Sequence, residues 1–163
     1  MIAAPKPPGL LLRMVLLLAS TRAGGWFFTT VTPGLDRWCL TKTDGRWSLA
    51  GLAIPTLLLT TRGRRSGLPR TAPLLYLPDG NDFLVVGSRR GRVAPPAWYE
   101  NLCQDPSVTV TVSGTRHDCE ATVLSGAERQ RCWQRFVAYN PGFARYQRRL
   151  ERRIPVIRLR PLI

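Results

Sequence analysis

Several residue types that build common catalytic sites are scarce in this sequence of 163 residues. His117 is the only histidine, so a metal site built from several histidines is excluded. The cysteines contain no Cys-x-x-Cys pair, which argues against structural zinc and leaves reduced, buried thiols as the expectation; they are Cys39, Cys103, Cys119 and Cys132. A serine or cysteine hydrolase would have to use His117, and no Gly-x-Ser-x-Gly turn accompanies it. These absences argue against zinc and hydrolase chemistry.

Lysine and acidic residues are also scarce, whereas arginine is abundant. The chain has 24 Lys plus Arg against 10 Asp plus Glu, a formal net charge of +14, and the only lysines are Lys6 and Lys42. Such a charge favours an anionic partner, which could be a phosphate group, a nucleic acid or an acidic membrane surface. A genome biased toward arginine codons would produce part of the same excess. Composition therefore leaves these alternatives open.

A hydrophobic run long enough to span a membrane is missing from the N-terminal part. Residues 10–19 are strongly apolar, but a spanning helix needs about 20 apolar residues, and Arg13 interrupts the run. Three interpretations remain: a helix that packs on the domain, a membrane-surface helix flanked by Arg13 and Arg22, and the apolar region of a signal peptide. We therefore treat residues 1–35 as an N-terminal segment with the capacity to associate with a membrane, and residues 36–163 as the domain.

Hydrophobic periodicity and turn residues predict an α+β domain. We expect strands at residues 56–61, 70–77, 82–88, 107–112, 116–124 and 154–159. We expect helices at residues 97–104, from a capping box at 125–128 to about Tyr139, and at 143–152. Pro73 is expected at a bulge or a strand edge. This order favours a small antiparallel β-barrel, closed or split, with flanking helices.

Two arginine-rich loops follow predicted strands. In residues 60–70, two glycines, Ser66 and up to four arginines could surround an anion together with successive backbone N–H groups. This loop lacks the lysine and the following helix of a Walker loop. The second loop spans residues 88–92. If strands 70–77 and 82–88 pair as a hairpin, both loops leave it at the same end, as one shared phosphate site would require. A solvated hairpin tip is the alternative.

Aromatic residues could provide flat walls beside these loops. Trp98 lies on the predicted helix 97–104, near the same end. Phe143 and Tyr146 lie three residues apart, on one face of a predicted helix. Residues in such patterns pack into a core more often than they stack on a ligand, so the pattern alone does not assign them a role.

Four segments together resemble the deazaflavin-dependent nitroreductase family, whose members bind reduced 8-hydroxy-5-deazaflavin coenzyme (F420). They follow the family's order and spacing: 58–70, 73–77, 96–102, and 141–147 with 152–156. The resemblance covers about residues 36–160 and implies a split β-barrel related to the flavin-mononucleotide oxidase barrels. It implies an oxidoreductase of the quinone- or nitro-reductase type, which transfers a hydride from the reduced coenzyme to a quinone or another electron-poor conjugated acceptor.

The resemblance also implies site residues, position by position. The cofactor-binding residues would be Arg64, Arg65, Ser66, Gly67, Arg70, Pro73, Ser88, Arg89, Ala97 and Trp98. Tyr146 and Phe143 would be the catalytic residues that close over the ring and the acceptor, with Tyr146 donating a hydrogen bond to the developing oxyanion. No metal is implied.

Three positions depart from the family pattern. Arg90 stands where a small residue is common, which could crowd the second loop. Asn140 and Phe143 stand where tyrosines are common. Phe143 cannot donate a hydrogen bond, and this puts nitroimidazole reduction in doubt more than coenzyme binding.

Other functions remain open. They are a basic nucleic-acid-binding barrel, a barrel that uses flavin mononucleotide, and a coenzyme carrier or sensor without catalysis. The arginines cluster at loops and no known RNA-binding motif is visible, so we expect a small quinone-like acceptor and no nucleic acid. An anionic membrane surface is a further candidate partner. We expect a cytoplasmic protein, peripheral on the inner face of the cell membrane if its N-terminal segment binds lipid.

Overall fold

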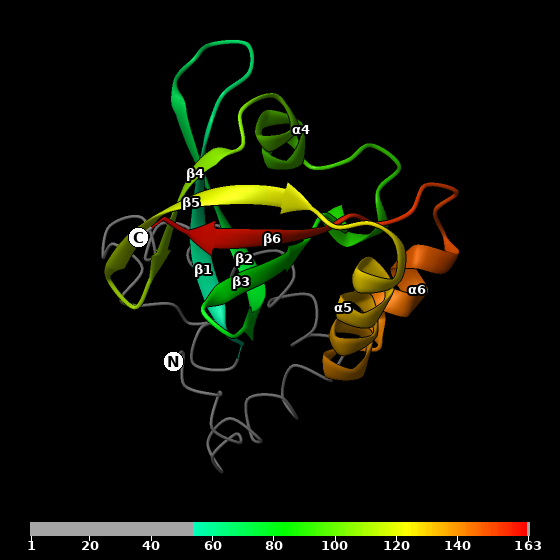
Figure 1. The fold of residues 1–163 in the computed structure, drawn as a ribbon. Helices are drawn as coiled ribbons and strands as arrows, with labels where there is room; N and C mark the ends of the chain where they lie inside the picture. Colours follow the sequence, from blue (N-terminus) through cyan, green and yellow to red (C-terminus); the bar gives the residue numbers. More distant parts are fainter. Residues whose placement is uncertain (1–53, 163) are drawn as a thin grey trace, which may run out of the picture.

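The structure is a computed structural model that describes residues 54–162 (Figure 1). The expected N-terminal segment 1–35, and the boundary with the domain that follows it, lie outside the described residues. The strands are β1 (Thr56–Arg62), β2 (Pro69–Asp79), β3 (Asp82–Val86), β4 (Ser107–Val112), β5 (Thr115–Val123) and β6 (Val156–Pro161). The helices are η1 (Arg89–Gly91, a 3₁₀ turn), α4 (Ala97–Gln104), α5 (Gly126–Tyr139) and α6 (Gly142–Arg148). Among the described residues, no helix is long and apolar enough to cross a membrane.

The strands form a closed antiparallel barrel in the order β1-β2-β3-β6-β5-β4, with β4 pairing back onto β1. Closure pairs every strand with two neighbours along part of its length, and β2 bonds to β1 alone over Pro69–Leu75. The predicted α+β class and the small antiparallel barrel with flanking helices are therefore confirmed. Helix α4 lies over β1 and β2, and α5 and α6 lie together at another side of the barrel (Figure 1).

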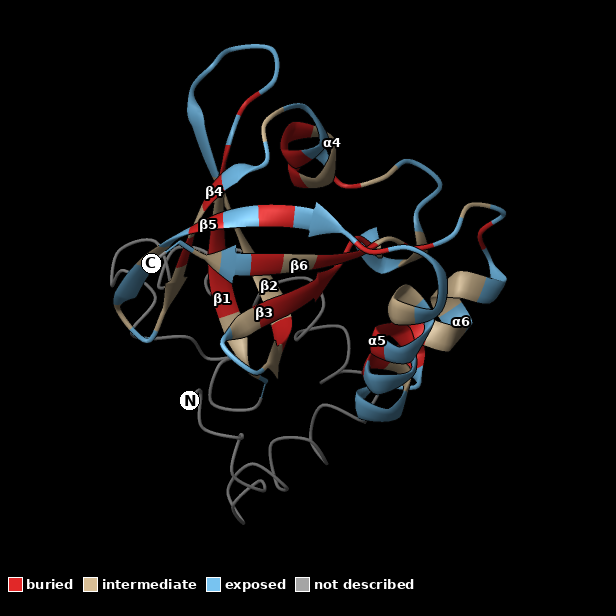
Figure 2. Cartoon of the chain, viewed as in Figure 1, coloured by how far each residue is buried: buried red, intermediate tan, exposed pale blue. Residues whose placement is uncertain are grey.

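Strand β3 separates two cores because successive side chains point to opposite faces of a strand. Phe83 and Val85 face the barrel interior, where Trp98 of α4 also packs. Leu84 and Val86 face a second cluster that α5 and α6 cover. The buried parts of β3 and β6 lie side by side in Figure 2. Burial on both faces explains why β3 reads as a nearly continuous apolar run.

Two tight turns show how local sequence fixes the register. Between β2 and β3, Gly80 adopts a φ of 64°. Between β4 and β5, Ser113 and Gly114 both have positive φ (50° and 81°), as a two-residue hairpin turn with the twist of its strands requires. The predicted hairpin at this place is confirmed, with strands at 107–112 and 115–123.

The predicted helix ends differ from the structure in two places. Ser125 is the N-cap residue of α5, but its side chain makes no capping hydrogen bond. The expected capping box is therefore wrong, because the Glu128 carboxylate pairs with Arg158 instead. The third helix ends at Arg148 rather than 152, and the last strand starts at Val156 rather than 154. Pro73 lies where β2 bonds to β1 alone, which agrees with the expected strand edge.

Candidate functional site

The first basic loop is a compact turn between β1 and β2. Its base is closed by a hydrogen bond from the Gly63 N–H to the Leu68 carbonyl (2.9 Å) and one from the Gly67 N–H to the Gly63 carbonyl (2.7 Å). Gly67 has a φ of 68°, which favours glycine, and a Cβ at Gly63 would lie 3.0 Å from the Leu68 carbonyl oxygen. The two glycines therefore allow the loop to fold tightly, while Arg64 and Arg65 remain exposed at its tip.

Helix α4 packs against this loop through a buried polar side chain. Trp98, Asn101 and Leu102 form its buried face, at the i, i+3, i+4 spacing of a helix. Asn101 Oδ1 accepts a hydrogen bond from the Arg64 N–H (3.2 Å), and Asn101 Nδ2 donates one to Thr61 Oγ1 (3.0 Å). The helix that carries Trp98 is thereby tied to the loop that carries the arginines.

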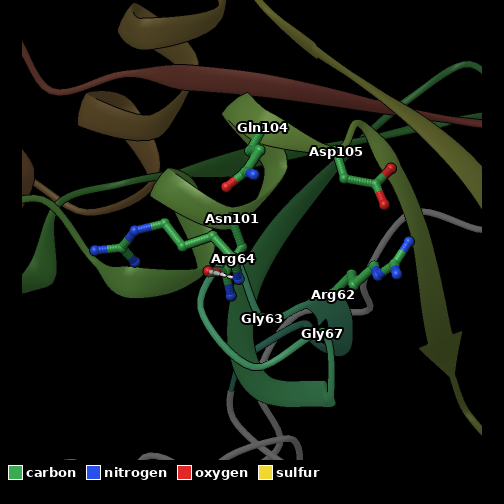
Figure 3. A pocket seen from close by; sticks show the side chains of 7 residues that line it. All are labelled: Arg62, Gly63, Arg64, Gly67, Asn101, Gln104 and Asp105. Atoms are coloured by element: carbon green, nitrogen blue, oxygen red, sulfur yellow. Dashed lines mark hydrogen bonds between the residues drawn. The ribbon is translucent and has the colours of Figure 1, made fainter.

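Two adjoining cavities lie around this contact. One, of about 420 Å³, is lined by arginine-loop residues, by β2 and by the start of α4: Gly63, Arg64, Arg65, Ser66, Arg70, Thr71, Ala72, Ala97, Trp98 and Asn101. The other, of about 460 Å³, is shown in Figure 3 and is lined by Arg62, Gly63, Arg64, Gly67, Asn101, Gln104 and Asp105. Gly63, Arg64 and Asn101 line both. The structure thus brings together seven of the ten predicted cofactor-binding residues at these two cavities.

The arginines around these cavities differ in their electrostatic partners. The Arg64 guanidinium lies 2.9 Å from the Glu100 carboxylate of α4. Arg65 and Arg70 form no ion pair with any residue from 54 to 162. The cavity between loop and helix therefore has an excess of positive charge, beside an apolar wall made by Ala72, Ala97 and Trp98.

The second basic loop lies farther from the first than a simple hairpin suggests. Both loops leave the β2–β3 hairpin at the same end, but the pairing of the two strands ends with Val85 opposite Tyr76, whereas β2 extends back to Pro69. Those six or seven residues of β2 correspond to roughly 20 Å of strand. Ser88 and Arg89 accordingly line neither of the two cavities.

The backbone of the second loop is unusual, and two arginines fix it. Ser88 is right-handed helical, and Arg89 and Arg90 follow with positive φ (44° and 53°). The Arg89 guanidinium donates to the carbonyls of Ala94 and Pro95, just before α4. The Arg152 guanidinium donates to three carbonyls of the same connection, those of Gly87, Arg92 and Val93. The loop conformation is therefore set from both sides by charge-assisted hydrogen bonds.

The two predicted catalytic residues lie beside the second loop. Tyr146 packs on Gly91, where an added Cβ would lie 3.2 Å from Tyr146 Cδ1. Phe143 is buried, and its ring lies 5.8–6.4 Å from the rings of Phe136, Trp133 and Tyr146. Tyr146 is half-buried and Phe143 belongs to the second core cluster. The structure thus groups them with Ser88 and Arg89, away from the cavities at the first loop.

One ionisable side chain near Trp98 has a shifted pKa. Burial, with a smaller contribution from a hydrogen bond to Cys103, raises the pKa of Tyr99. Its phenol therefore stays neutral at physiological pH and packs edge-on against Trp98, with ring centroids 6.4 Å apart. Trp98 itself is 8% exposed, so it is both a core residue and a wall of the cavity.

Sequence reasoning missed four residues of this region: Thr61, Glu100, Asn101 and Arg152. A signal was present for Asn101, because an amide stands where the helical spacing predicts an apolar residue. A buried polar residue at such a position needs a specific partner. No comparable signal marked Arg152, whose partners are backbone carbonyls far away in the sequence.

Comparisons with known proteins show which family the chain resembles. A family model described as F420H(2)-dependent quinone reductase matches residues 36–161. The chain is 44% identical over 108 residues to a Mycobacterium tuberculosis H37Rv protein provisionally named as such a reductase, covering 66% of this chain and 91% of that protein. It is 36% identical over 108 residues to an F420H(2)-dependent quinone reductase of the same strain, covering 64% and 72% of the two chains. The solved structure of an F420-H2 dependent reductase superposes with a TM-score of 0.60 at 34% identity, over 64% of this chain and 93% of that one.

Proposed function

The chain belongs to the F420H(2)-dependent quinone reductase family, and on that premise we propose that the cavities at the first loop hold the coenzyme. The protein is an oxidoreductase with F420 as its coenzyme. When bound, reduced F420 supplies a hydride for the reduction of a quinone. The residues of this chain bind the coenzyme, orient it and exclude water from the reacting faces.

The chemistry of the cavity fits an anionic, ring-bearing ligand. Arg65 and Arg70 are free of ion pairs within the described residues, so they are available for a phosphate group. Ser66 and Gly67 add polar backbone close to these charges. Ala97 and Trp98 supply a flat apolar wall, and a volume of about 420 Å³ is within the usual range of small-molecule sites.

The second loop is proposed to contact the coenzyme through its backbone. The sequence of a right-handed Ser88 followed by a left-handed Arg89 is the pattern that turns successive N–H groups toward one point, where an anion can bind. The Arg89 side chain serves by holding the connection to Ala97 and Trp98, through the carbonyls of Ala94 and Pro95. Pro73 remains part of the proposed site because it lies on the stretch of β2 between the two loops that bonds to β1 alone.

Tyr146 and Phe143 are proposed for the acceptor side. The Tyr146 ring packs on Gly91 of the second loop, and its hydroxyl would stabilise negative charge on the quinone oxygen. A hydrogen bond of this kind contributes about 1–3 kcal/mol in a dry site. Phe143 supports the Tyr146 ring, because the two rings meet edge to face with centroids 6.3 Å apart.

An anionic membrane surface is a second proposed partner. Arginines on α6 and directly after it are exposed and make no ion pair with residues 54–162: Arg145, Arg148, Arg149 and Arg153. They would attract acidic lipids, in which quinones with long apolar tails dissolve. The membrane interpretation of residues 10–28 belongs to the same proposal. Vesicles with and without acidic lipid, sedimented with the full chain, test it: equal binding to both would contradict it.

One observation carries the assignment of the coenzyme site: six of the ten residues that the family resemblance implied line one cavity, in which Arg65 and Arg70 form no ion pair within residues 54–162. The experiment titrates the protein with reduced F420, adds a soluble quinone and follows reoxidation. Charge reversal at Arg65 and Arg70 should weaken coenzyme binding strongly. Unchanged affinity in the doubly reversed variant would reject the proposed phosphate contacts, and tight binding of flavin mononucleotide instead would reject the coenzyme.

A further inference from the structure

Asn101 is one of only two buried polar or charged residues among those that the structure describes, and the other, Thr61, is its hydrogen-bond partner. They are 5% and 1% exposed. A buried polar side chain is costly unless all its groups are satisfied, so such a pair is retained only where its hydrogen bonds are well made. The pair lies between β1, the first loop and α4, directly beside both cavities.

The hydrogen bonds of this pair form one continuous chain. The Arg64 N–H donates to Asn101 Oδ1, Asn101 Nδ2 donates to Thr61 Oγ1, and the Thr61 hydroxyl donates to the Arg70 carbonyl (3.4 Å). The chain begins and ends on residues of the first loop and its exit strand. Figure 3 shows the Asn101 amide against the Arg64 backbone, with the Arg64 side chain extending away along the helix.

The Asn101 side chain also links the first loop to the apolar wall of the cavity. Trp98 lies one helical turn before Asn101, on the same buried face of α4. A shift of α4 would move Trp98 and, through Asn101, the backbone of Arg64 together. The positive loop and the ring wall are therefore held at a fixed separation before any ligand arrives.

We propose that Asn101 is a positioning residue that keeps the first loop in its coenzyme-binding conformation, a proposal that rests on the function proposed above. It acts through the backbone of Arg64 and through Thr61. Without the amide, the loop must be ordered when the coenzyme binds, and the lost preorganisation weakens binding. The effect falls on coenzyme affinity and KM, whereas kcat at saturating coenzyme changes little, because Asn101 does not act on the reacting atoms.

The experiment compares three substitutions by fluorescence titration with oxidised F420 and by steady-state kinetics. Asn101→Ala removes both hydrogen bonds, and we expect Kd and KM for the coenzyme to rise about tenfold with kcat within about twofold. Asn101→Asp keeps an acceptor for the Arg64 N–H and loses the donor to Thr61, so its affinity should lie between wild type and Asn101→Ala. Thr61→Val should weaken binding, and Thr61→Ser, which restores the hydroxyl, should recover it.

A matched control separates positioning from loss of stability. Cys132 is a buried residue of α5 in the second core cluster, and Cys132→Ala should lower Tm without changing coenzyme affinity. Wild-type affinity in folded Asn101→Ala, or a kcat loss without a change in KM, would overturn the proposal. If Asn101→Ala does not fold, equal affinity of Thr61→Val and Thr61→Ser overturns it in the same way. Absence of coenzyme binding by the wild-type protein would instead reject the proposed function.

Discussion

The arginines of the first loop differ in how their charge is balanced, although the sequence presents them as one cluster. Arg64 has a carboxylate partner on α4, at 2.9 Å, whereas Arg65 and Arg70 have none among residues 54–162. The Arg64–Glu100 pair is partly exposed, with side-chain exposures of 31% and 38%. Such pairs contribute little to stability. The Arg64–Glu100 pair matters for binding instead, because the Glu100 carboxylate competes with an anionic ligand for the Arg64 guanidinium.

Glu100→Gln should therefore increase affinity for the coenzyme. Removing the carboxylate frees Arg64 and lowers the negative charge beside the cavity, and we expect Kd for F420 to fall about two- to fivefold, as an exposed ion pair of up to about 1 kcal/mol allows. Titration of the purified variant measures this directly. Glu120→Gln makes the same charge change at an exposed position of β5 and should leave Kd unchanged. A weaker affinity in Glu100→Gln would show that the ion pair helps binding by holding Arg64 in place.

The cysteines also differ in the pKa and the reactivity of their thiols, because they differ in burial. Burial is the main cause that raises the pKa of Cys119 to about 11, with a smaller contribution from the Asp118 and Asp82 charges. Burial likewise raises the pKa of Cys132. The expectation of a buried thiol is wrong for Cys103, which is exposed on α4. The buried thiols are therefore protonated at neutral pH, and their unreactivity follows from both low access and low thiolate content.

Among the three cysteines of residues 54–162, iodoacetamide should modify Cys103 first in the native protein. At about pH 8 a thiol with a pKa near 11 is about one part in a thousand thiolate, so Cys119 should react only after unfolding. Peptide mass mapping before and after denaturation distinguishes the sites. The raised pKa also affects stability. The Cys119 thiol stabilises the folded state fully at pH values below its pKa in the unfolded chain, and this contribution is lost as the pH rises through about 11. Rapid native modification of Cys119 would contradict its position in the barrel core.

Strand and helix packing on one side of the barrel depends on Arg158 of β6. Its guanidinium lies 2.6 Å from Glu128 of α5, 2.8 Å from Asp79 and 3.3 Å from Asp82, at the two ends of the β2–β3 turn. Arg135 of α5 also pairs with Asp79. Burial tends to raise the pKa of Asp79, but hydrogen bonds from Arg135 and Arg158 outweigh it and lower that pKa. The network therefore joins α5 to the hairpin through charge.

Replacing Arg158 by methionine should lower the free energy of unfolding by about 1–3 kcal/mol at neutral pH, because three partly buried carboxylates lose their shared partner. Because the pKa of Asp79 is lowered in the folded protein, its ionised carboxylate stabilises the fold at pH values above its pKa in the unfolded chain, which is about 4. This stabilisation is lost as the pH falls through the folded-state pKa, so wild type and variant should converge in acid. Urea unfolding at neutral and at acidic pH measures the difference. Arg160→Met, at an exposed position with one 3.5 Å pair, is the control and should cost under about 0.5 kcal/mol.

Sequence patterns predicted helix and strand boundaries well where residues close in the sequence determine them. Pro96 and Asp105-Pro106 mark the start and end of α4, and the predicted bounds 97–104 are those of the structure. The capping box failed because Glu128 has a stronger partner on β6, thirty residues away in the sequence. Local sequence also did not reveal the distance between the two basic loops, because the seven-residue extension of β2 is set by pairing with β1. Long-range partners thus decided what local sequence could not.

At the scale of the whole molecule, the arginines divide into those that are paired within the fold and those that are exposed and unpaired. Residues 54–162 contain 18 arginines and 8 acidic residues. Arg129, Arg135, Arg152 and Arg158 are engaged with carbonyls or carboxylates, and they stabilise the fold rather than bind a ligand. Arg65 and Arg70 at the first loop, and the exposed arginines of α6, remain unpaired among the described residues. The unpaired arginines of the first loop and of α6 therefore give two exposed surfaces a positive charge.

If the first of these surfaces binds the coenzyme, affinity should fall with ionic strength. The screening length shortens from about 10 Å at 0.1 M salt to about 3 Å at 1 M, so exposed guanidinium groups attract a multiply charged anion less. We expect Kd and KM for F420 to rise several-fold across this range while kcat stays constant. A variant with Arg65→Gln and Arg70→Gln should show a flatter dependence. A variant with Arg131→Gln and Arg149→Gln removes the same charge at exposed positions of α5 and just after α6, and it should keep the wild-type slope, since screening acts over short distances. Equal slopes in the two double variants would mean that the overall charge, rather than the first loop, attracts the coenzyme.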